Sequence, residues 1–332
     1  MKVTRLLELD ALRGLAALAV VFYHYFYRYD TLYQHDDNIA VKWAQFGHFG
    51  VELFFMVSGF VIFWTLHRVK APLDFIVSRF SRLYPTYWVS LAFTYMIISV
   101  FGLSGREVPL TEALGNMLMF HQYLGIEHVD GVYWTLTVEL TFYFWVFCLF
   151  LMNSLSKVEY VFITMVGFSV LDGLGYLNIP KPVYAAFILK YISFFLAGIC
   201  FYKITHDMKA NKTWVILGMS LLSTIAVYSY GEFLLFCFFY IIFYLASSGN
   251  LRFLTYKPLV LLGSISYPLY LIHQNLGYVV INAFYQFKWH PLAGILLALV
   301  LSVIVAYVLA RFVEKPAVAS IRQFYRDWKT IR

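Results

Sequence analysis

The sequence predicts an all-α fold: a polytopic integral membrane helix bundle of about ten transmembrane helices, with both termini cytoplasmic. Hydrophobic residues make up 61% of the 332 residues and charged residues only 13%, whereas an average soluble domain is about 25% charged. Mean hydropathy is +0.72, and apolar runs recur at the roughly 17–25 residues needed to cross a bilayer. We therefore expect a multi-pass membrane protein with one transmembrane domain over 1–332.

The apolar runs follow one another along the chain with short polar connections between them. The longest connection, 104–130, is expected to contain a short helix at 111–123. The ninth run contains Pro268 and Gly277, which favour a kink or a break in a helix. The predicted spans are 10–29, 46–67, 85–103, 131–152, 159–177, 184–203, 213–229, 231–248, 259–286 and 292–313.

The distribution of basic residues predicts the orientation of this bundle. With ten spans both termini lie on the same side, and nineteen of the 25 lysines and arginines fall on that side. Five fall on the opposite side, and Lys190 lies within a span. Because basic connections stay in the cytoplasm, the termini are predicted to be cytoplasmic, and 314–332 is a short basic tail. Topology thus explains the net charge of +7, and nucleic-acid binding is not expected.

The first predicted span contains two ionisable residues, Arg13 near its start and His24 deep inside. They are eleven residues apart, which is roughly 16 Å along a helix. Ionisable groups within a span are costly and usually face the bundle interior or a watery cavity. His24 is therefore the leading candidate for the reactive centre. The alternative is a histidine that packs against polar neighbours and has no chemical role.

Three further ionisable residues are predicted at the same depth as His24. Counted from the span ends, Glu52 lies about 9 Å and Glu139 about 12 Å from the outer end, and His273 about 21 Å from the inner end. An imidazole beside a carboxylate is the arrangement of a general base. We therefore interpret His24, Glu139, Glu52 and His273 as catalytic residues. The alternative for the glutamates is a structural pair with arginine, lysine or tyrosine.

Basic residues gather at the predicted cytoplasmic end. Arg79 and Arg82 are three residues apart and share one helix face, and guanidinium groups suit phosphate oxygens. With Arg13 they would form a basic entrance for an anionic cofactor. The alternative is that they only contact lipid headgroups.

Hydroxyl and aromatic side chains precede two of the catalytic candidates. Ser266, Tyr267 and Tyr270 lead to His273, and Trp134 begins the run that leads to Glu139. We interpret these four residues as substrate-binding. The alternative is a kinked helix whose hydroxyl groups bond to its own backbone.

Other residues are interpreted as packing or surface residues. Gly50 and Gly59 allow close helix approach, and the three cysteines have no paired or metal-like spacing. The sequence contains no zinc-ligand cluster, glycine-rich phosphate loop or serine nucleophile elbow, so no metal is expected. Five further histidines are interpreted as solvated or interfacial: His35, His48, His121, His128 and His290.

Five stretches together resemble acyltransferase family 3, a family of integral membrane proteins. They are the Arg13-to-His24 spacing, 50–60 (GVELFFMVSGF), 79–85 (RFSRLYP), 134–143 (WTLTVELTFY) and 266–273 (SYPLYLIH). They follow the family order over nearly the whole chain. One departure is that Glu139 is followed by Leu140, where the family often has a second acidic residue.

The resemblance implies an O-acyltransferase of the stand-alone form, without a fused esterase-like domain. Its donor would be a cytosolic acyl-CoA, most commonly acetyl-CoA. Its acceptor would be a carbohydrate hydroxyl of a cell-envelope or exported glycan, free or lipid-linked, at the outer side of a bacterial inner membrane. His24, oriented by Glu139 or Glu52, would take the hydroxyl proton, and hydroxyl groups near His273 would stabilise the oxyanion. A two-step route through an acyl group on His24 is also open.

A proton-coupled transporter of a small polar solute is the competing hypothesis, because proton relays also use intramembrane His and Glu. That hypothesis predicts internal repeats with matching broken helices. We find no convincing similarity between the two halves of the chain, and a transporter leaves the Arg79 and Arg82 pair unexplained.

Overall fold

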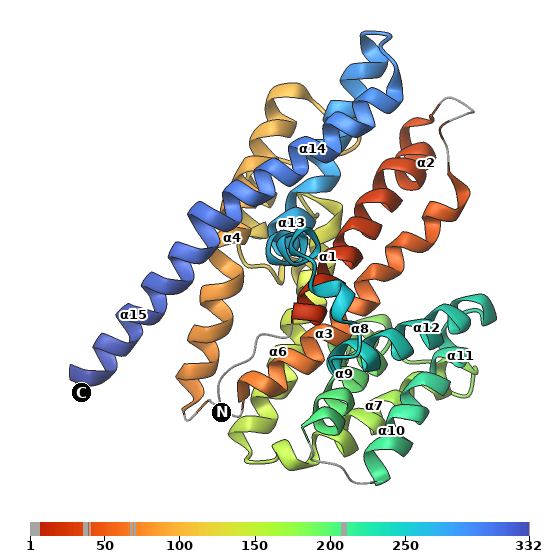
Figure 1. Cartoon of the computed structure of the whole chain (residues 1–332), viewed down its shortest axis with the longest axis vertical. Helices are drawn as coiled ribbons and strands as arrows, with labels where there is room; N and C mark the ends of the chain where they lie inside the picture. The colour runs from red at the N-terminus through yellow and green to blue at the C-terminus, as the bar shows by residue number, and fades with distance from the viewer. Residues whose placement is uncertain are drawn as a thin grey trace. The chain divides into compact units, whose positions relative to one another are not determined.

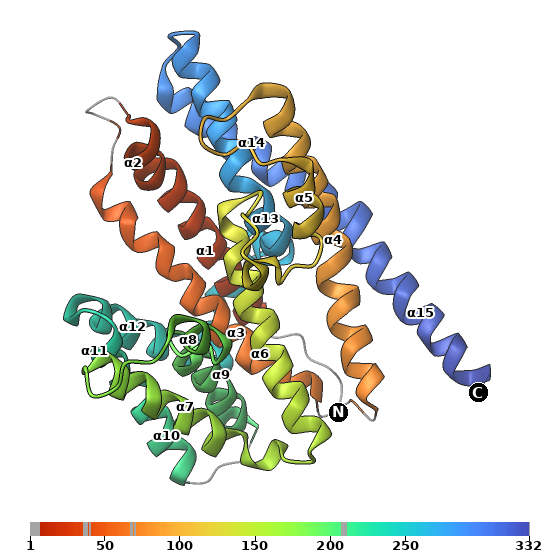
Figure 2. The same ribbon diagram turned by 180° about the vertical axis from the view of Figure 1, so that it is seen from behind.

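A computed structural model describes residues 7–35, 39, 41–66, 69, 71–206 and 211–331. Regular structure in these residues is helical (Figures 1 and 2), which confirms the predicted all-α class. The chain divides into two compact units. Unit 1 comprises Met1–Arg13, Glu52–Pro72 and Val138–Val260, and unit 2 comprises Gly14–Val51, Leu73–Thr137 and Leu261–Arg332.

Unit 1 contains most of α3 (Gly50–Leu66) and α6 (Trp134–Leu151). It also contains α7 (Val158–Gly173), α8 (Lys181–Ala186), α9 (Ile192–Thr205), α10 (Asn211–Leu222), α11 (Thr224–Val227) and α12 (Tyr230–Ser247). The core is centred on α9, in which every residue from 192 to 204 is buried. Gly59 lies against the carbonyl oxygen of Phe195, where a Cβ has no room. This contact confirms the predicted packing role of Gly59.

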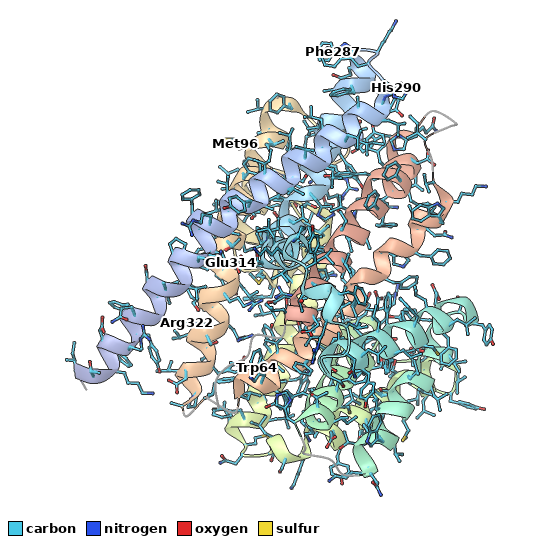
Figure 3. The ribbon with its side chains drawn as sticks, viewed as in Figure 1. Trp64, Met96, Phe287, His290, Glu314 and Arg322 are labelled. Carbon is cyan, nitrogen blue, oxygen red and sulfur yellow. The ribbon has the colours of Figure 1, made fainter. Side chains whose placement is uncertain are left out.

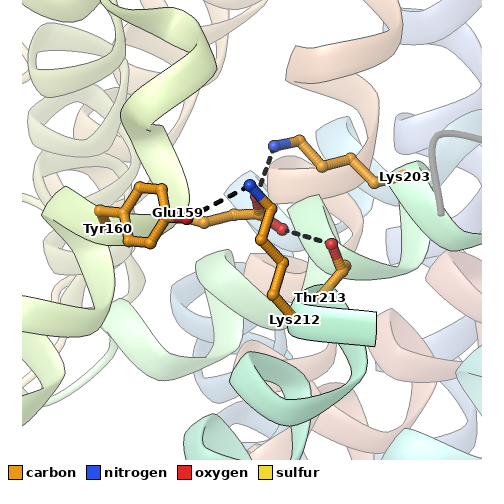
Figure 4. A network of polar contacts seen from close by, with 5 residues as sticks. All are labelled: Glu159, Tyr160, Lys203, Lys212 and Thr213. Carbon is orange, nitrogen blue, oxygen red and sulfur yellow. Dashed lines mark hydrogen bonds and ion pairs between the residues drawn. The ribbon is translucent and has the colours of Figure 1, made fainter. Parts of the chain in front are cut away.

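A buried ion pair connects α7 to α9 within unit 1 (Figure 4). Lys203 Nζ lies 2.7 Å from Glu159 Oε2, and Thr213 Oγ1 of α10 donates a hydrogen bond to Glu159 Oε1 at 2.9 Å. Glu159 is 1% exposed and Lys203 8%. Both carboxylate oxygens therefore have a partner inside the protein.

Unit 2 contains α1 (Leu7–Phe22) from Gly14 onward, a π-helical turn (Tyr23–Arg28) and α2 (Tyr29–Tyr33). It continues with α4 (Pro72–Phe101), α5 (Leu110–Asn116), α13 (Lys257–Gln286, mostly in this unit), α14 (Pro291–Leu309) and α15 (Lys315–Ile331). A second π-helical turn, Ala310–Glu314, joins α14 to α15. These three segments form one long helical stretch that ends at the C-terminus (Figure 1).

Six helical segments in the described residues are long and apolar enough to cross a membrane. They are Leu7–Tyr33, Lys42–Leu66, Pro72–Phe101, Gly131–Leu151, Tyr230–Ser247 and Pro291–Ile331. Each overlaps a predicted span, and shorter apolar helices cover Ile192–Thr205 and Asn211–Val227. The fold is therefore that of a multi-pass membrane protein, whereas ten crossings and cytoplasmic termini stay predictions. Six charges used to predict the orientation lie outside the described residues: Lys2, Arg5, Arg68, Lys70, Lys209 and Arg332.

Several predicted boundaries are wrong. The span 184–203 is not one helix, because Ile188 adopts a positive φ of 46° between α8 and α9, a conformation that ends a helix. The short helix expected at 111–123 stops at Asn116. The helix α13 continues through Pro268, which excludes a break there, whereas a kink at Pro268 stays a prediction.

Candidate active site

His24 lies in the π-helical turn that follows α1 in unit 2. Such turns contain one extra residue per turn and are frequent at functional sites. The side chain is 9% exposed, and its Nδ1 lies 2.9 Å from the carbonyl oxygen of Val20. The imidazole is thus held against the backbone of the preceding turn of the same helix.

His273 of α13, in the same unit, lies beside His24. Nε2 of His273 lies 3.1 Å from Nδ1 of His24, and the two rings meet edge to face with centroids 4.9 Å apart. His273 is fully buried. The structure therefore brings together the two histidines that the sequence placed at one depth.

The hydrogen-bond partners of this pair determine where its protons lie. Nδ1 of His273 faces the carbonyl oxygens of Leu269 and Tyr270, at 3.1 and 2.9 Å. Carbonyl oxygens only accept, so this nitrogen carries the proton and Nε2 of His273 is an acceptor. Nδ1–H of His24 then donates to Val20 and His273. This assignment, inferred from the network, leaves the lone pair on Nε2 of His24 without a donor among the described residues, which is the state a general base requires.

A buried tyrosine holds the histidine pair in place. The hydroxyl of Tyr25 donates to the backbone oxygen of His273 at 2.8 Å, and it also lies 2.8 Å from Ser302 Oγ of α14. The Tyr25 ring packs directly against Gly277, where a Cβ has no room. Tyr25 therefore connects the π-helical turn to α13 and α14.

Two buried polar atoms near the pair have no partner in the described part of the chain. They are the hydroxyl of Tyr278 and Oδ1 of Asn275, both on α13. The Tyr278 ring centroid lies 6.4 Å from that of His24, and the Arg106 guanidinium lies 6.0 Å above the Tyr278 ring. Buried polar groups are normally hydrogen-bonded, so an unpaired hydroxyl beside the pair marks a binding position.

Sequence reasoning did not find Tyr278, Asn275 or Arg106. The tyrosine and asparagine have a usable signal, because they follow His273 within two helical turns on the same helix. Arg106 lies in the connection after α4, where nothing in the sequence indicates that it folds back towards α13.

The predicted substrate-binding hydroxyls already have partners within unit 2. Ser266 Oγ donates to the carbonyl oxygen of Gly263, and the Tyr267 hydroxyl to that of Leu83. The Tyr270 hydroxyl accepts from Thr135 Oγ1 at 2.9 Å. Trp134 begins α6 and is half-buried. These contacts show how the four residues pack, and their role towards a substrate stays a prediction.

The two predicted glutamates belong to unit 1. Glu139 Oε1 accepts hydrogen bonds from Ser58 Oγ and from the Tyr143 hydroxyl, both at 2.5 Å. Glu52 is 4% exposed, and the Tyr228 hydroxyl lies 3.4 Å from its Oε1. Their predicted role towards His24 stays a prediction.

The predicted phosphate-binding arginines lie on α4 and face a second basic segment. Arg79 is 8% exposed, and Arg82 lines a cavity of about 950 Å³. The rest of that lining comes from residues 314–327, mainly on α15. Arg13 lies in unit 1, 3.8 Å from Asp10, so its part in the same entrance stays a prediction.

The helix α13 connects the arginine cavity to the histidine pair within unit 2. The Tyr267 hydroxyl bonds to the carbonyl oxygen of Leu83, the residue after Arg82, at 2.9 Å. His273 follows Tyr267 by six residues, about 9 Å along the helix. On α4, the hydroxyls of Thr86 and Ser90 follow Arg82 at four-residue spacing, and both are buried without a partner among the described residues. A polar seam therefore leads away from the arginine cavity.

The described residues thus form an all-helical membrane fold with a buried histidine pair and a cavity that has a basic lining. The chain matches a family described as an acyltransferase domain over residues 6–311. It belongs to acyltransferase family 3.

Three curated relatives are similar over part of the chain. Nodulation protein 10 of Rhizobium leguminosarum bv. viciae is 29% identical over 40% of this chain and 41% of its own. Acyltransferase MdmB of Streptomyces mycarofaciens is 27% identical over 43% and 38%. Peptidoglycan O-acetyltransferase OatA of Listeria monocytogenes is 27% identical over 41% and 22%. The chain thus matches less than half the length of each, and no solved structure matches it.

Proposed function

We propose that this acyltransferase moves an acyl group, acetyl in the first instance, from cytosolic acyl-CoA to a carbohydrate hydroxyl of a cell-envelope glycan. The observation that carries this proposal is the histidine pair, in which Nε2 of His24 is left ready to accept a proton. A relative named as a peptidoglycan O-acetyltransferase supports a carbohydrate acceptor.

In the proposed reaction, Nε2 of His24 takes the proton of the acceptor hydroxyl as its oxygen attacks the thioester carbonyl. The positive charge that forms on His24 is stabilised because Nδ1–H donates to Val20 and His273. The Tyr278 hydroxyl and Arg106 would stabilise the oxyanion. When the carbon–sulfur bond breaks, His24 returns the proton to the leaving thiolate. In the two-step route, Nε2 of His24 would itself carry the acyl group.

The donor would enter from the cytoplasmic side. Arg79 and Arg82 would bind its phosphates as bidentate guanidinium groups, with Arg13 at the same entrance. The pantetheine arm contains amide groups, and the unpartnered hydroxyls of Thr86 and Ser90 would give it hydrogen bonds along α4. This arrangement requires ten spans, cytoplasmic termini and, in a bacterium, the inner membrane. The predicted role of Glu139 and Glu52 in orienting His24 is part of this proposal.

The test is a thiol-release assay with purified protein and acetyl-CoA, with and without glycan acceptors. An acyltransferase of this kind releases CoA thiol and gives an acetylated glycan by mass spectrometry. Proton-coupled uptake of a solute by reconstituted protein, without thiol release, would overturn the proposal.

The donor part of the proposal is tested by two substitutions at one position. Arg82→Ala should weaken acyl-CoA binding by about 10–100-fold, because a charge-assisted contact is lost. Arg82→Lys should restore it only partly, since an ammonium group cannot form the bidentate contact. Wild-type affinity in both variants would show that the donor binds elsewhere.

A further inference from the structure

The helix α15 places a basic face against α4. Arg322 NH2 lies 3.5 Å from Ser78 Oγ, and Lys329 Nζ lies 3.0 Å from Asp74 Oδ1. Arg326 follows Arg322 by four residues and lies on the same face of the helix. The cavity at Arg82 therefore has a second basic wall, from a segment that the sequence identified only as a tail.

Positive charges converge on this cavity. Lys315, Arg322 and Arg326 line it opposite Arg82, and Figure 3 marks Arg322 on α15. The positive charges of Arg79, Arg82 and Arg326 repel that of Arg322. Among the described residues, neither Arg82, Arg322 nor Arg326 forms an ion pair with a carboxylate.

Two acidic residues also line the cavity, but they do not neutralise it. Asp327 Oδ1 accepts a hydrogen bond from Gln323 Nε2 at 2.7 Å, and Glu314 is half-buried at the start of α15. The lining still has four basic groups against these two carboxylates. Like charges held close together repel one another, so a bound anion would stabilise the arrangement.

The opposite face of α15 indicates which anion this is. Phe324 and Ile331 are 75% and 85% exposed, and Trp328 lies on the same apolar stripe. A helix at the membrane surface normally turns its apolar face to the lipid. Here the basic face is turned to α4 instead, and Phe324 also borders the cavity. A soluble ligand in the cavity fits this geometry better than a lipid headgroup.

We propose that Arg322 and Arg326 of α15 bind the phosphates of the donor nucleotide, and that they select CoA by its 3′-phosphate. This inference rests on the proposed function. CoA carries a diphosphate and a phosphate monoester, which together exceed what Arg79 and Arg82 would hold bidentately. The cavity, at about 950 Å³, is in the range of sites for ligands of this size. The C-terminal helix is thus half of the donor site.

The test uses the full chain in nanodiscs of neutral phosphatidylcholine, with CoA and 3′-dephospho-CoA as probes. Wild-type protein should bind CoA about 10-fold or more tightly than 3′-dephospho-CoA, in line with one charge-assisted contact. The double variant Arg322→Gln/Arg326→Gln should bind CoA about 10–100-fold more weakly and lose most of this preference. The matched control is Lys329→Gln, because Lys329 lies on the same face but is paired with Asp74.

The outcomes separate this inference from the proposed function. If wild-type protein binds CoA and the double variant binds it equally well, α15 is not part of the donor site, whereas the acyltransfer proposal stands. If wild-type protein neither binds CoA nor releases its thiol, both are wrong. Repeating the binding in nanodiscs that contain phosphatidylglycerol distinguishes the lipid source. Two results would assign the basic face to lipid phosphate. In the first, phosphatidylglycerol competes with CoA and abolishes its binding. In the second, the double variant loses bound phosphatidylglycerol but still binds CoA.

Discussion

In unit 1, Glu159 and Lys203 lie buried and satisfy each other, with Thr213 completing the carboxylate. In unit 2, the buried polar groups around His24 are only partly satisfied, and the Tyr278 hydroxyl has no partner among the described residues. Burying a polar group without a partner costs free energy, and a buried ion pair rarely gives net stability. We therefore expect the Glu159–Lys203 pair to serve the fold, and the unpaired Tyr278 hydroxyl to be available to a substrate.

The largest expected effect comes from removing the imidazole of His24. His24→Ala should lower acyl transfer by about 10²–10⁴-fold, because a general base is lost, while acyl-CoA binding and melting temperature stay near wild type. Thiol-release rates and donor binding measure the two properties separately. Substantial acyl transfer by a well-folded His24→Ala variant would show that His24 has only a packing role. A mass increase on the His24 peptide with acyl-CoA alone would favour the two-step route.

The reverse pattern is expected in unit 1. Lys203→Met should destabilise the protein by about 3–5 kcal/mol, because Glu159 is left as an unpaired buried charge. The double variant Lys203→Met/Glu159→Leu should recover much of that loss. Thermal unfolding in detergent measures both, and transfer per folded molecule should stay unchanged. A loss of activity without a loss of stability would place this ion pair in the catalytic machinery.

Two tyrosines beside the histidine pair of unit 2 provide a test with a smaller expected effect. Tyr278→Phe removes a hydroxyl without a partner, so it should leave stability unchanged and lower the rate by about 10–100-fold if the hydroxyl bonds to the developing oxyanion. Tyr25→Phe removes the bonds to His273 and Ser302 and should lower the melting temperature. Equal effects of the two substitutions on stability and rate would argue against the assigned difference.

The smallest effect concerns pH, in the connection between α4 and α6. Burial, and then the neighbouring His128 ring, lower the pKa of His121 to about 4, so unfolded protein binds more protons between pH 4 and 6.5 and acidification destabilises the fold. Burial raises the pKa of Asp130 to about 7. Folded protein therefore binds more protons at Asp130 between pH 4 and 7, so at this residue acidification stabilises the fold.

Single substitutions separate these two contributions. Asp130→Asn should lose more stability than wild type as the pH falls from 7 to 5, and His121→Asn should lose less. Melting temperatures at three pH values in that window provide the measurement. Parallel profiles for all three proteins would show that neither group titrates as the structure indicates.

The fold could be predicted largely from the sequence because the bilayer fixes the length of an apolar helix. The errors lie where local conformation overrides composition, as at Ile188. The interpretation of His121 as a surface residue is also wrong: it is fully buried, with Nε2 2.7 Å from His128 Nδ1. A polar connection gives no periodic signal from which such burial can be predicted.

The candidate site could be predicted in part. His24 and His273 are detectable because an ionisable residue in an apolar run is unusual. Their contact could not be derived, because the π-helical turn changes which residues share a face. Arg322 and Arg326 were counted as topology charges, since a basic tail after a last span fits the positive-inside rule without any ligand. Figure 2 shows the 102–130 connection, with α5, beside α4; Arg106 reaches the site from this connection.

The π-helical turn at Tyr23–Arg28 has a consequence for comparing relatives. It amounts to a one-residue insertion in a helix, and each residue added to an α-helix rotates all later side chains by about 100°. In a relative that has the same residues but no such turn, the histidine side chain, or the side chains that follow it in the helix, would point in another direction. Alignments of this helix therefore need a one-residue gap allowed within 23–28, and a relative that lacks that residue should be examined for a different partner to its histidine.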